Sequence, residues 1–199
     1  NLLLLGTNDI EKYGHHINVR RGSYTRSWQE VLIASTDGTF ARDIRLHQSL
    51  GFNVLSSDKE HISNVGRRYG SSGSPNHINN WDSDDAAKDL CESAHKMLYA
   101  EYVEAGQMPV ILANKFGGVI FHEACGHLLE TTQIERGTSP FANKLDQQIA
   151  HPSVTAIDEG NTSGAFGSYD IDDEGMEPEK TILIDKGILK RFISDRASE

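Results

Sequence analysis

Hydrophobic and polar positions alternate at short range through the first quarter of the chain. Runs rich in β-branched or aromatic residues are separated by pairs that favour turns, and this pattern predicts β-strands. Asp37-Gly38 indicates a hairpin, because glycine tolerates the positive φ that tight hairpin turns require. Residues 66–80 are rich in Gly, Ser and Asn and predict a loop. We expect strands over residues 17–21, 27–35, 40–48 and 51–56.

From Ser83 onward the apolar positions follow a helical period and fall mostly on one stripe. Ser83 is the expected N-cap, and the carboxylates of Asp84 and Asp85 favour the positive end of the helix dipole. Gly106 is a natural stop signal. The pattern therefore predicts a long helix near residues 83–105.

The second half of the chain mixes both periods. A second helix is expected to begin near Gly117-Gly118, and Lys186-Gly187 is expected to form the turn between the last two strands. The strands predicted here cover residues 109–113, 154–157, 181–185 and 189–194. Together these elements predict an α+β fold that is rich in antiparallel β-structure.

The charge balance argues against nucleic-acid binding. The 199 residues carry a formal charge of −10, and the longest basic cluster is Arg20-Arg21. An acidic surface of this kind repels phosphate backbones. The hydrophobic content of 37% is that of a chain able to form a core, which excludes a fully disordered polymer.

The cysteines and the N-terminal apolar run limit the cellular setting. Cys91 and Cys125 could form one bridge at most, so a reducing, cytoplasmic location is expected. The run from Leu2 to Leu5 is too short for a membrane span, and no membrane association is expected. Because the chain begins with Asn1 rather than Met, we expect a segment of a longer protein.

One short segment combines residue types suited to metal chemistry. His122, Glu123 and His127 lie within six residues. Imidazole nitrogens are good zinc ligands, and a nearby carboxylate that does not bind the metal can take a proton from water. Metalloproteases with the HExxH motif combine the same groups. The alternative is that two histidines lie close together in a protein without a metal.

The spacing of the two histidines is one residue longer than in HExxH. In a regular α-helix, positions i and i+5 lie about 140° apart, so the imidazoles would diverge. A π-turn would bring them to one face, and Gly126 could ease it because glycine has no side chain to clash. We therefore predict a non-ideal turn over residues 124–127. Cys125 is expected to be a packed residue rather than a ligand, since positions i and i+2 face different ways.

The sequence around this segment resembles the TldD branch of the TldD/PmbA zinc metallopeptidases. The resemblance rests on GVIFHEACGHLLE, RGTSPF, KLDQQIAHPSVTAIDEG, DIDDEG and TILIDKGILKRFISD, in this order within residues 109–199. Upstream, WQEVLIASTDGTFARD is similar to part of the middle domain of that family. The resemblance implies that residues 1–107 are a middle α+β region of hairpins followed by a helix. Residues 108–199 would then begin a C-terminal β-rich catalytic domain.

The resemblance also implies an activity. A TldD-like subunit carries zinc and works with a related TldE (PmbA) subunit that lacks HExxxH, and unfolded or short peptides are cleaved during peptide maturation or degradation. By this resemblance His122 and His127 bind the metal and Glu123 is the general base. The third ligand is a cysteine expected beyond residue 199, so the 199 residues alone are expected to be inactive. A homo-oligomer is an alternative to the TldE-like partner, and a non-catalytic peptide-binding or partner subunit is the alternative function.

Two further acidic features have two interpretations each. Glu130 follows His127 by three residues and either reaches back to that imidazole or is a solvated carboxylate at a helix end. Residues 170–175 partly imitate a calcium loop, but Thr181 replaces the bidentate glutamate that such a loop needs. This acidic loop is either a solvated turn or, by the resemblance, part of the mouth of the active-site cleft.

Overall fold

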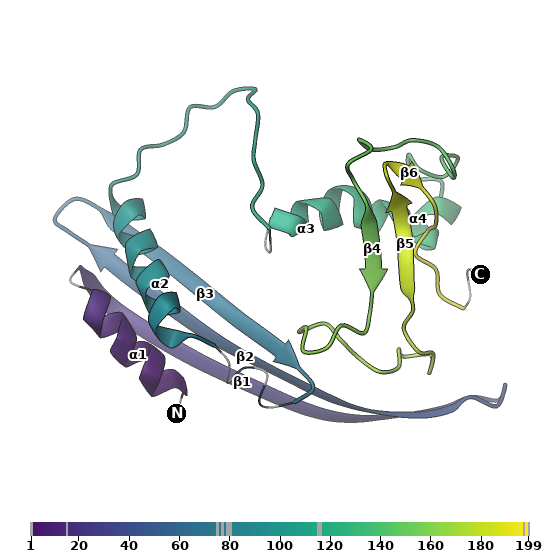
Figure 1. Cartoon of the computed structure of the whole chain (residues 1–199), viewed down its shortest axis with the longest axis horizontal. Helices are drawn as coiled ribbons and strands as arrows, with labels where there is room; N and C mark the ends of the chain where they lie inside the picture. The colour runs from purple at the N-terminus through teal and green to yellow at the C-terminus, as the bar shows by residue number, and fades with distance from the viewer. Residues whose placement is uncertain are drawn as a thin grey trace. The chain divides into compact units, whose positions relative to one another are not determined.

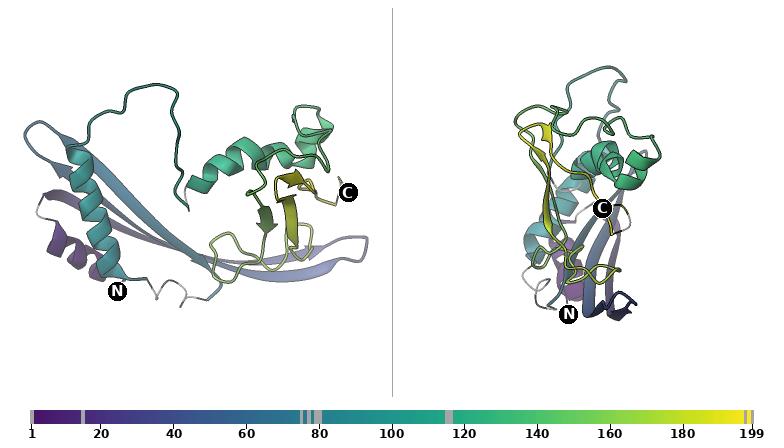
Figure 2. Two further views of the ribbon diagram at one scale, coloured as in Figure 1. Left: turned by 45° about the horizontal axis from the view of Figure 1, so that its top comes forward. Right: turned by 90° about the vertical axis from the view of Figure 1, so that its right-hand side faces the viewer.

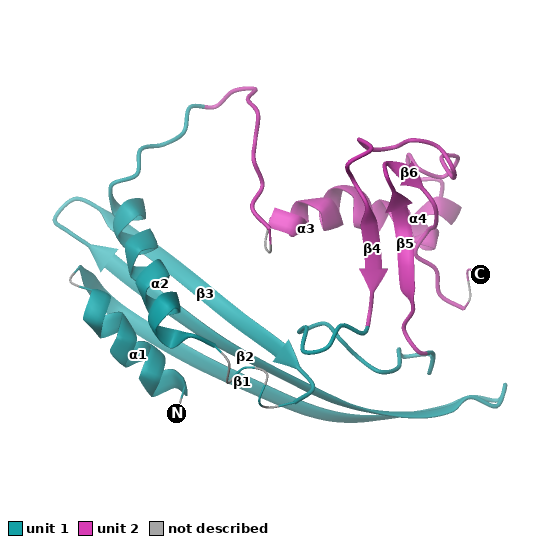
Figure 3. Ribbon diagram, in the orientation of Figure 1, with its two compact units in different colours: residues 1–104, 161–176 teal, residues 105–160, 177–199 magenta. Residues whose placement is uncertain are grey.

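The computed structural model describes residues 2–14, 16–74, 76, 78, 81–114, 117–196 and 198. The chain forms two compact units (Figure 3). The first contains residues 1–104 and 161–176, and the second contains residues 105–160 and 177–199. Each unit has a three-stranded antiparallel sheet and at least one helix, so the predicted α+β fold is confirmed. Among the described residues, no helix is long and apolar enough to cross a membrane.

The sheet of the first unit is a meander of three long strands in the order β1-β2-β3 (Figure 1). They are β1 (Ile17–Ala34), β2 (Phe40–Ser57) and β3 (Ile62–Ser72). The predicted Asp37-Gly38 hairpin is confirmed, with Gly38 at φ 98°. Pairing between β1 and β2 is continuous from Val19 opposite Leu55 to Ala34 opposite Phe40. The four short strands predicted here are therefore two long ones, because backbone pairing continues through the polar residues between them.

The prediction of a loop from residue 66 was wrong as far as Ser72. Residues 66–72 belong to β3, and Gly66, Arg68 and Gly70 pair with β2 through the backbone. A strand paired in this way does not need apolar side chains of its own, which is why composition misled the prediction. Of the remaining residues, 75, 77, 79 and 80 lie outside the described part of the chain.

Two helices, α1 (Leu2–Tyr13) and α2 (Ser83–Leu98), lie on the same face of this sheet (Figures 1 and 2). Their apolar sides pack on alternate residues of β2. Helix α1 was not predicted, because its four leucines form only a short apolar run and its amphipathic character is evident only with the sheet on which it packs. The fully or nearly buried core residues are Ile10, Leu50, Phe52, Val54, Ile78, Ala87, Leu90, Cys91 and Ala94.

Helix α2 differs at both ends from the prediction. Its N-cap is Asp82 rather than Ser83, because the Asp82 side chain accepts hydrogen bonds from the backbone N–H groups of Asp84 and Asp85, each at 3.1 Å. The helix ends at Leu98 instead of continuing to residue 105. Val103 is 81% exposed, so the apolar positions after Leu98 have no core that would favour continuing the helix.

A segment from the second half of the sequence packs on the first unit. Residues 161–176 lie between two strands of the second unit in sequence but belong to the first unit in space. Arg45 holds this segment. Its guanidinium donates to Ile171 O at 2.8 Å and pairs with Asp173 at 2.9 Å and with the buried Asp43 at 3.2 Å. Within the acidic loop, the carboxylate of Asp172 accepts two backbone N–H groups of its own turn.

The second unit combines a broken helix with a small sheet. The helical segment runs through α3 (Gly118–Phe121), a π-helical turn (His122–Gly126), a 3₁₀ turn (His127–Leu129) and α4 (Thr131–Glu135). The sheet has the order β4-β5-β6, with β4 (Ala156–Glu159), β5 (Lys180–Asp185) and β6 (Ile188–Leu189). Its core consists of Leu129, Ala156, Leu183, Ile184 and Leu189.

In this unit one predicted turn is confirmed, one predicted strand is shorter than expected and another is absent. The turn at Lys186-Gly187 is confirmed, and both residues have positive φ, 47° and 85°. The predicted last strand stops at Leu189, and only an isolated bridge at Ile193 follows. Residues 109–113 form no strand. Ile111 is 99% exposed, and none of the pairings among described residues includes this segment.

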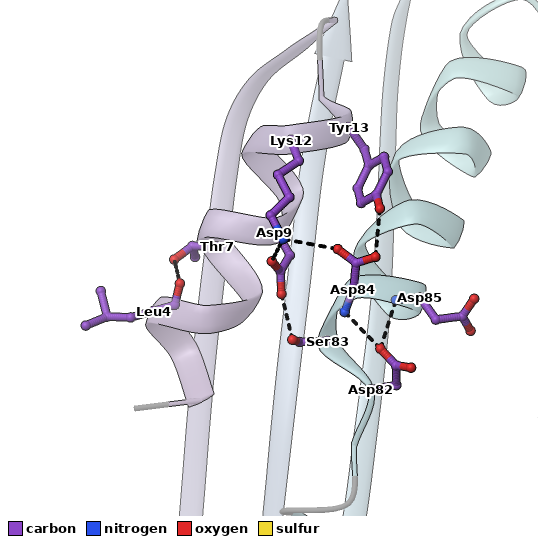
Figure 4. A network of polar contacts seen from close by, with 9 residues as sticks. All are labelled: Leu4, Thr7, Asp9, Lys12, Tyr13, Asp82, Ser83, Asp84 and Asp85. Carbon is purple, nitrogen blue, oxygen red and sulfur yellow. Dashed lines mark hydrogen bonds and ion pairs between the residues drawn. The ribbon is translucent and has the colours of Figure 1, made fainter.

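A polar network joins α1 to the start of α2 (Figure 4). Asp9 is 7% exposed, pairs with Lys12 at 2.6 Å and accepts from Ser83 Oγ at 2.6 Å. Asp84 accepts from Tyr13 OH at 2.7 Å and from Lys12 Nζ at 3.2 Å. The hydrogen bonds from Lys12 and Ser83 lower the pKa of Asp9 below its ordinary value of 3.8. The ionised form of Asp9 therefore stabilises the folded state.

We predict that Asp9→Asn lowers the free energy of unfolding at pH 7 by about 1–3 kcal/mol, the usual contribution of hydrogen bonds to a charged group. Because the pKa of Asp9 is lower in the folded than in the unfolded protein, this contribution is present above pH 3.8 and is lost as the pH falls through the folded pKa. Urea denaturation at several pH values measures it. Glu101→Gln, at an exposed position, is the control. An equal difference between wild type and Asp9→Asn at pH 7 and pH 2 would contradict the prediction.

Candidate metal centre

The backbone of the HExxxH segment contains a π-turn. The N–H of His127 donates to the carbonyl of His122, which is a hydrogen bond from residue i+5 to residue i. The preceding turn is α-helical, with the N–H of His122 bonded to the carbonyl of Gly118. The predicted non-ideal turn is therefore confirmed. The wider turn places one additional residue between the two histidines while keeping both on one side of the helix.

The two imidazoles converge. Their ring centroids are 4.3 Å apart and the ring planes lie at 64° to one another. One ligand atom from each of His122, Glu123 and His127 can be chosen so that all three lie within 4.8 Å of one another. All three side chains are exposed. The residues that the sequence singled out are therefore brought together at a point open to solvent.

Glu123 lies beside the imidazole of His127. Its Oε2 is 3.7 Å from Nε2 of His127, which is longer than a hydrogen bond, and its side chain is 64% exposed. The carboxylate therefore faces the same point as the ring nitrogen. A carboxylate in this position can accept a proton from a molecule bound between them.

Glu130 contacts the other nitrogen of the same ring. Its Oε1 lies 2.7 Å from Nδ1 of His127, so of the two interpretations of Glu130 the structure shows the one in which the carboxylate reaches back. This hydrogen bond is the main cause of a raised pKa of His127. The negative charges of Glu130 and Glu123 add to the shift, and partial desolvation of the ring opposes it. Since a metal ligand must be a neutral imidazole, protons compete with a metal at His127 up to a higher pH than at an ordinary histidine.

Cys125 belongs to the core rather than to the converging group. Its side chain packs against the apolar core of the second unit, and its thiol is free. Desolvation raises the pKa of this thiol, so the thiolate that would bind a metal is disfavoured. This agrees with the expectation of a packed residue.

The donor set fits a transition metal such as zinc in part. Two imidazoles suit zinc, and the adjacent carboxylate suits a general base. A catalytic zinc normally has three protein ligands and one open position. The described residues bring together two imidazoles and one carboxylate, so a third protein ligand is needed if Glu123 is to remain free.

No pattern in the sequence indicates which residues hold the backbone of Glu130. Its backbone forms a parallel bridge with Ile193, which is 63 positions further along the chain. Neither residue type is distinctive, and bridges between distant segments leave no local pattern in a sequence. Only the three-dimensional structure could show this contact.

The structure does not support the expected role of Gly126. Its backbone is right-handed helical, with φ −53° and ψ −57°, a conformation open to any residue. A methyl group there would lie 3.5 Å from Nδ1 of His122, an ordinary contact. The π-turn therefore does not depend on a glycine to avoid a side-chain clash.

We predict that Gly126→Ala keeps the π-turn and raises the free energy of unfolding by about 0.5–1 kcal/mol, since alanine is the better helix former. Thermal unfolding and zinc titration measure the two effects. Gly38→Ala is the contrasting variant. Gly38 has φ 98°, a conformation that alanine adopts only with strain, so that variant should be less stable than wild type. A loss of stability in Gly126→Ala similar to that in Gly38→Ala would show that the glycine is required.

Comparison with known proteins identifies related sequences for both halves of the chain. Residues 3–98 match the central domain of the PmbA/TldA metallopeptidases, and residues 105–199 match the C-terminal domain of the same family. The chain is 35% identical over 192 residues to a protein of Haemophilus influenzae named metalloprotease TldD homolog. It is 32% identical over 191 residues to a protein of the same name from Buchnera aphidicola of the aphid Acyrthosiphon pisum. Each alignment covers 92% of this chain and 39% of the relative.

Solved structures share the fold at low sequence identity. A Thermotoga maritima protein, described as a candidate modulator of a DNA gyrase, superposes with a TM-score of 0.81 at 16% identity. That match covers 99% of this chain and 45% of the other. TldE from Thermococcus kodakarensis superposes with a TM-score of 0.68 at 17% identity, covering 98% of this chain and 44% of TldE.

The two converging histidines and the adjacent carboxylate are the group of residues that the sequence predicted for a metallopeptidase. The matches to both family domains, which adjoin and together span almost the whole sequence, are more specific. The chain belongs to the TldD/PmbA family of metallopeptidases. It spans about two fifths of the length of the curated relatives that it matches.

Proposed function

We propose that this chain is the metal-bearing part of a zinc-dependent peptidase that cleaves unfolded or short peptides. The observation that carries the proposal is the π-turn, which turns His122 and His127 to one point with Glu123 beside them. The relatives are named metalloproteases, which supports hydrolysis of peptide bonds at such a point.

Each residue of the site has a distinct role in this proposal. His122 and His127 hold the ion through ring nitrogens. Zinc, when bound, lowers the pKa of a coordinated water and polarises the carbonyl of the peptide bond. Glu123 takes the proton of the attacking water and passes it to the leaving amine, as expected of an exposed carboxylate 3.7 Å from Nε2 of His127.

The rest of the protein completes the assembly in this proposal. A third ligand, by family resemblance a cysteine, comes from the part of the polypeptide that follows these residues. A TldE-like subunit is the proposed partner, and the shared fold with TldE of Thermococcus kodakarensis supports it, since related subunits can pair. We place the complex in the cytoplasm because both cysteines are free thiols.

We predict that, in the full-length protein with its partner, His122→Ala loses bound zinc, whereas Glu123→Gln retains zinc and loses peptidase activity by about 10²–10⁴-fold. The physical reason is that the first removes a ligand and the second removes only the proton acceptor. Metal analysis and cleavage of an unfolded peptide measure the two effects. His151→Ala is a matched control, because its ring contacts only Ser153 among the bonds that the structure describes.

Two outcomes would contradict the proposal. A wild-type protein that binds no zinc under any condition of reconstitution would favour the non-catalytic alternative. Cleavage by Glu123→Gln at the wild-type rate would remove Glu123 from its role.

A further inference from the structure

We propose that Glu130 is the positioning residue of the metal centre, and that it forces His127 to bind the ion through Nε2. The inference rests on the proposed zinc site and adds a specific role for a residue outside the HExxxH motif. It is carried by the 2.7 Å contact between Glu130 Oε1 and His127 Nδ1 together with the way the structure fixes the backbone of Glu130.

The contact determines which nitrogen is free. A carboxylate can only accept, so Nδ1 of His127 must carry the hydrogen and donate it to Glu130. In a neutral imidazole the other nitrogen, Nε2, then presents its lone pair. Nε2 is also the nitrogen on the side of Glu123, at 3.7 Å from its Oε2. Glu130 thus directs the lone pair of His127 toward the carboxylate that serves as the base.

The backbone around Glu130 is held on both sides. The N–H of Ile193 donates to the carbonyl of Leu129 at 2.8 Å, and the N–H of Thr131 donates to the carbonyl of Ile193 at 2.8 Å. Thr131 Oγ1 also donates to that carbonyl at 3.1 Å. Leu129, next to Glu130, is completely buried in the core of the second unit. The carboxylate is therefore presented from a fixed backbone rather than from a free helix end.

The backbone conformation explains how the carboxylate reaches the ring. The helical segment ends at Glu130, which has φ −68° and ψ 133°, an extended conformation. This change of direction separates the 3₁₀ turn from α4. It leaves the side chain of Glu130 beside His127, which lies three positions earlier in the sequence. A helix that continued without interruption would not provide the bridge to Ile193. The break in the helix thus contributes to the orientation of the His127 imidazole.

His122 lacks this support. Among the bonds of the described residues, none joins its ring to a carboxylate or a carbonyl, and its closest ring neighbour is His127. For the choice of tautomer, the two histidines therefore differ in the carboxylate that contacts Nδ1 of His127. His122 can serve as the internal reference for any measurement on His127.

The test uses full-length protein labelled with ¹⁵N at histidine, as wild type, Glu130→Leu, Glu130→Gln and Glu135→Gln. Glu135 is a nearby exposed carboxylate on α4 and provides the matched control. In the metal-free proteins, ¹⁵N chemical shifts report which nitrogen of each imidazole carries the hydrogen. Titration with Zn²⁺ against a chromophoric chelator then gives the affinity of each variant.

We expect wild type and Glu135→Gln to show His127 with its hydrogen on Nδ1. In Glu130→Leu the hydrogen should move toward Nε2, and zinc affinity should fall by about 10–100-fold, the usual effect of removing such a partner. Glu130→Gln keeps an acceptor without the charge and should lie between the two. The tautomer of His122 should be the same in all four proteins. Loss of folding alone would not produce this graded order.

Two results would overturn the inference. One is an unchanged tautomer of His127 in Glu130→Leu, and the other is a zinc affinity within twofold of wild type in the same variant. A wild-type protein that binds no zinc would instead overturn the proposed function. In that case the tautomer measurement, which needs no metal, would still decide whether Glu130 orients His127.

Discussion

In the candidate metal centre, the convergence of the two histidines depends on the π-turn, which includes the backbone hydrogen bond from the N–H of His127 to the carbonyl of His122. This bond joins residue i+5 to residue i, whereas an α-helix joins residue i+4 to residue i. Without it the two imidazoles would lie about 140° apart around the helix axis and could not reach one ion. With it their ring centroids lie 4.3 Å apart, and Glu123 is placed at the same point.

The surrounding structure holds this turn in place from the C-terminal side. The 3₁₀ turn after His127 ends in the buried Leu129, and the bridge to Ile193 fixes the next two residues. Cys125 packs into the same core from within the π-turn. One side of the irregular segment is thus anchored in the small sheet of the second unit, while the side with the histidines stays exposed. The candidate metal ligands therefore lie at a point open to solvent on a backbone that the core holds.

Several of these features could be predicted from the sequence, and those that could not have physical reasons. HExxxH spacing was sufficient to predict the π-turn, because the angular period of a helix leaves few ways to align positions i and i+5. Turns at Asp37-Gly38 and Lys186-Gly187 followed from the conformational freedom of glycine. By contrast, β3 was missed because pairing with β2 depends on backbone groups that every residue has. Helix α1 was missed because its amphipathic character is evident only with the sheet on which it packs. The bridge between Glu130 and Ile193 could not be predicted from the sequence, because it joins residues that lie far apart along the chain.

X-ray absorption spectroscopy of the zinc-loaded full-length protein is the most direct measurement of the central claim. If the π-turn brings both histidines to one ion, the spectrum should contain scattering from two imidazoles at a Zn–N distance of about 2.0–2.1 Å. Replacement of either histidine should remove one of the two contributions. A spectrum of wild-type protein that shows one imidazole or none at bound zinc would contradict the account.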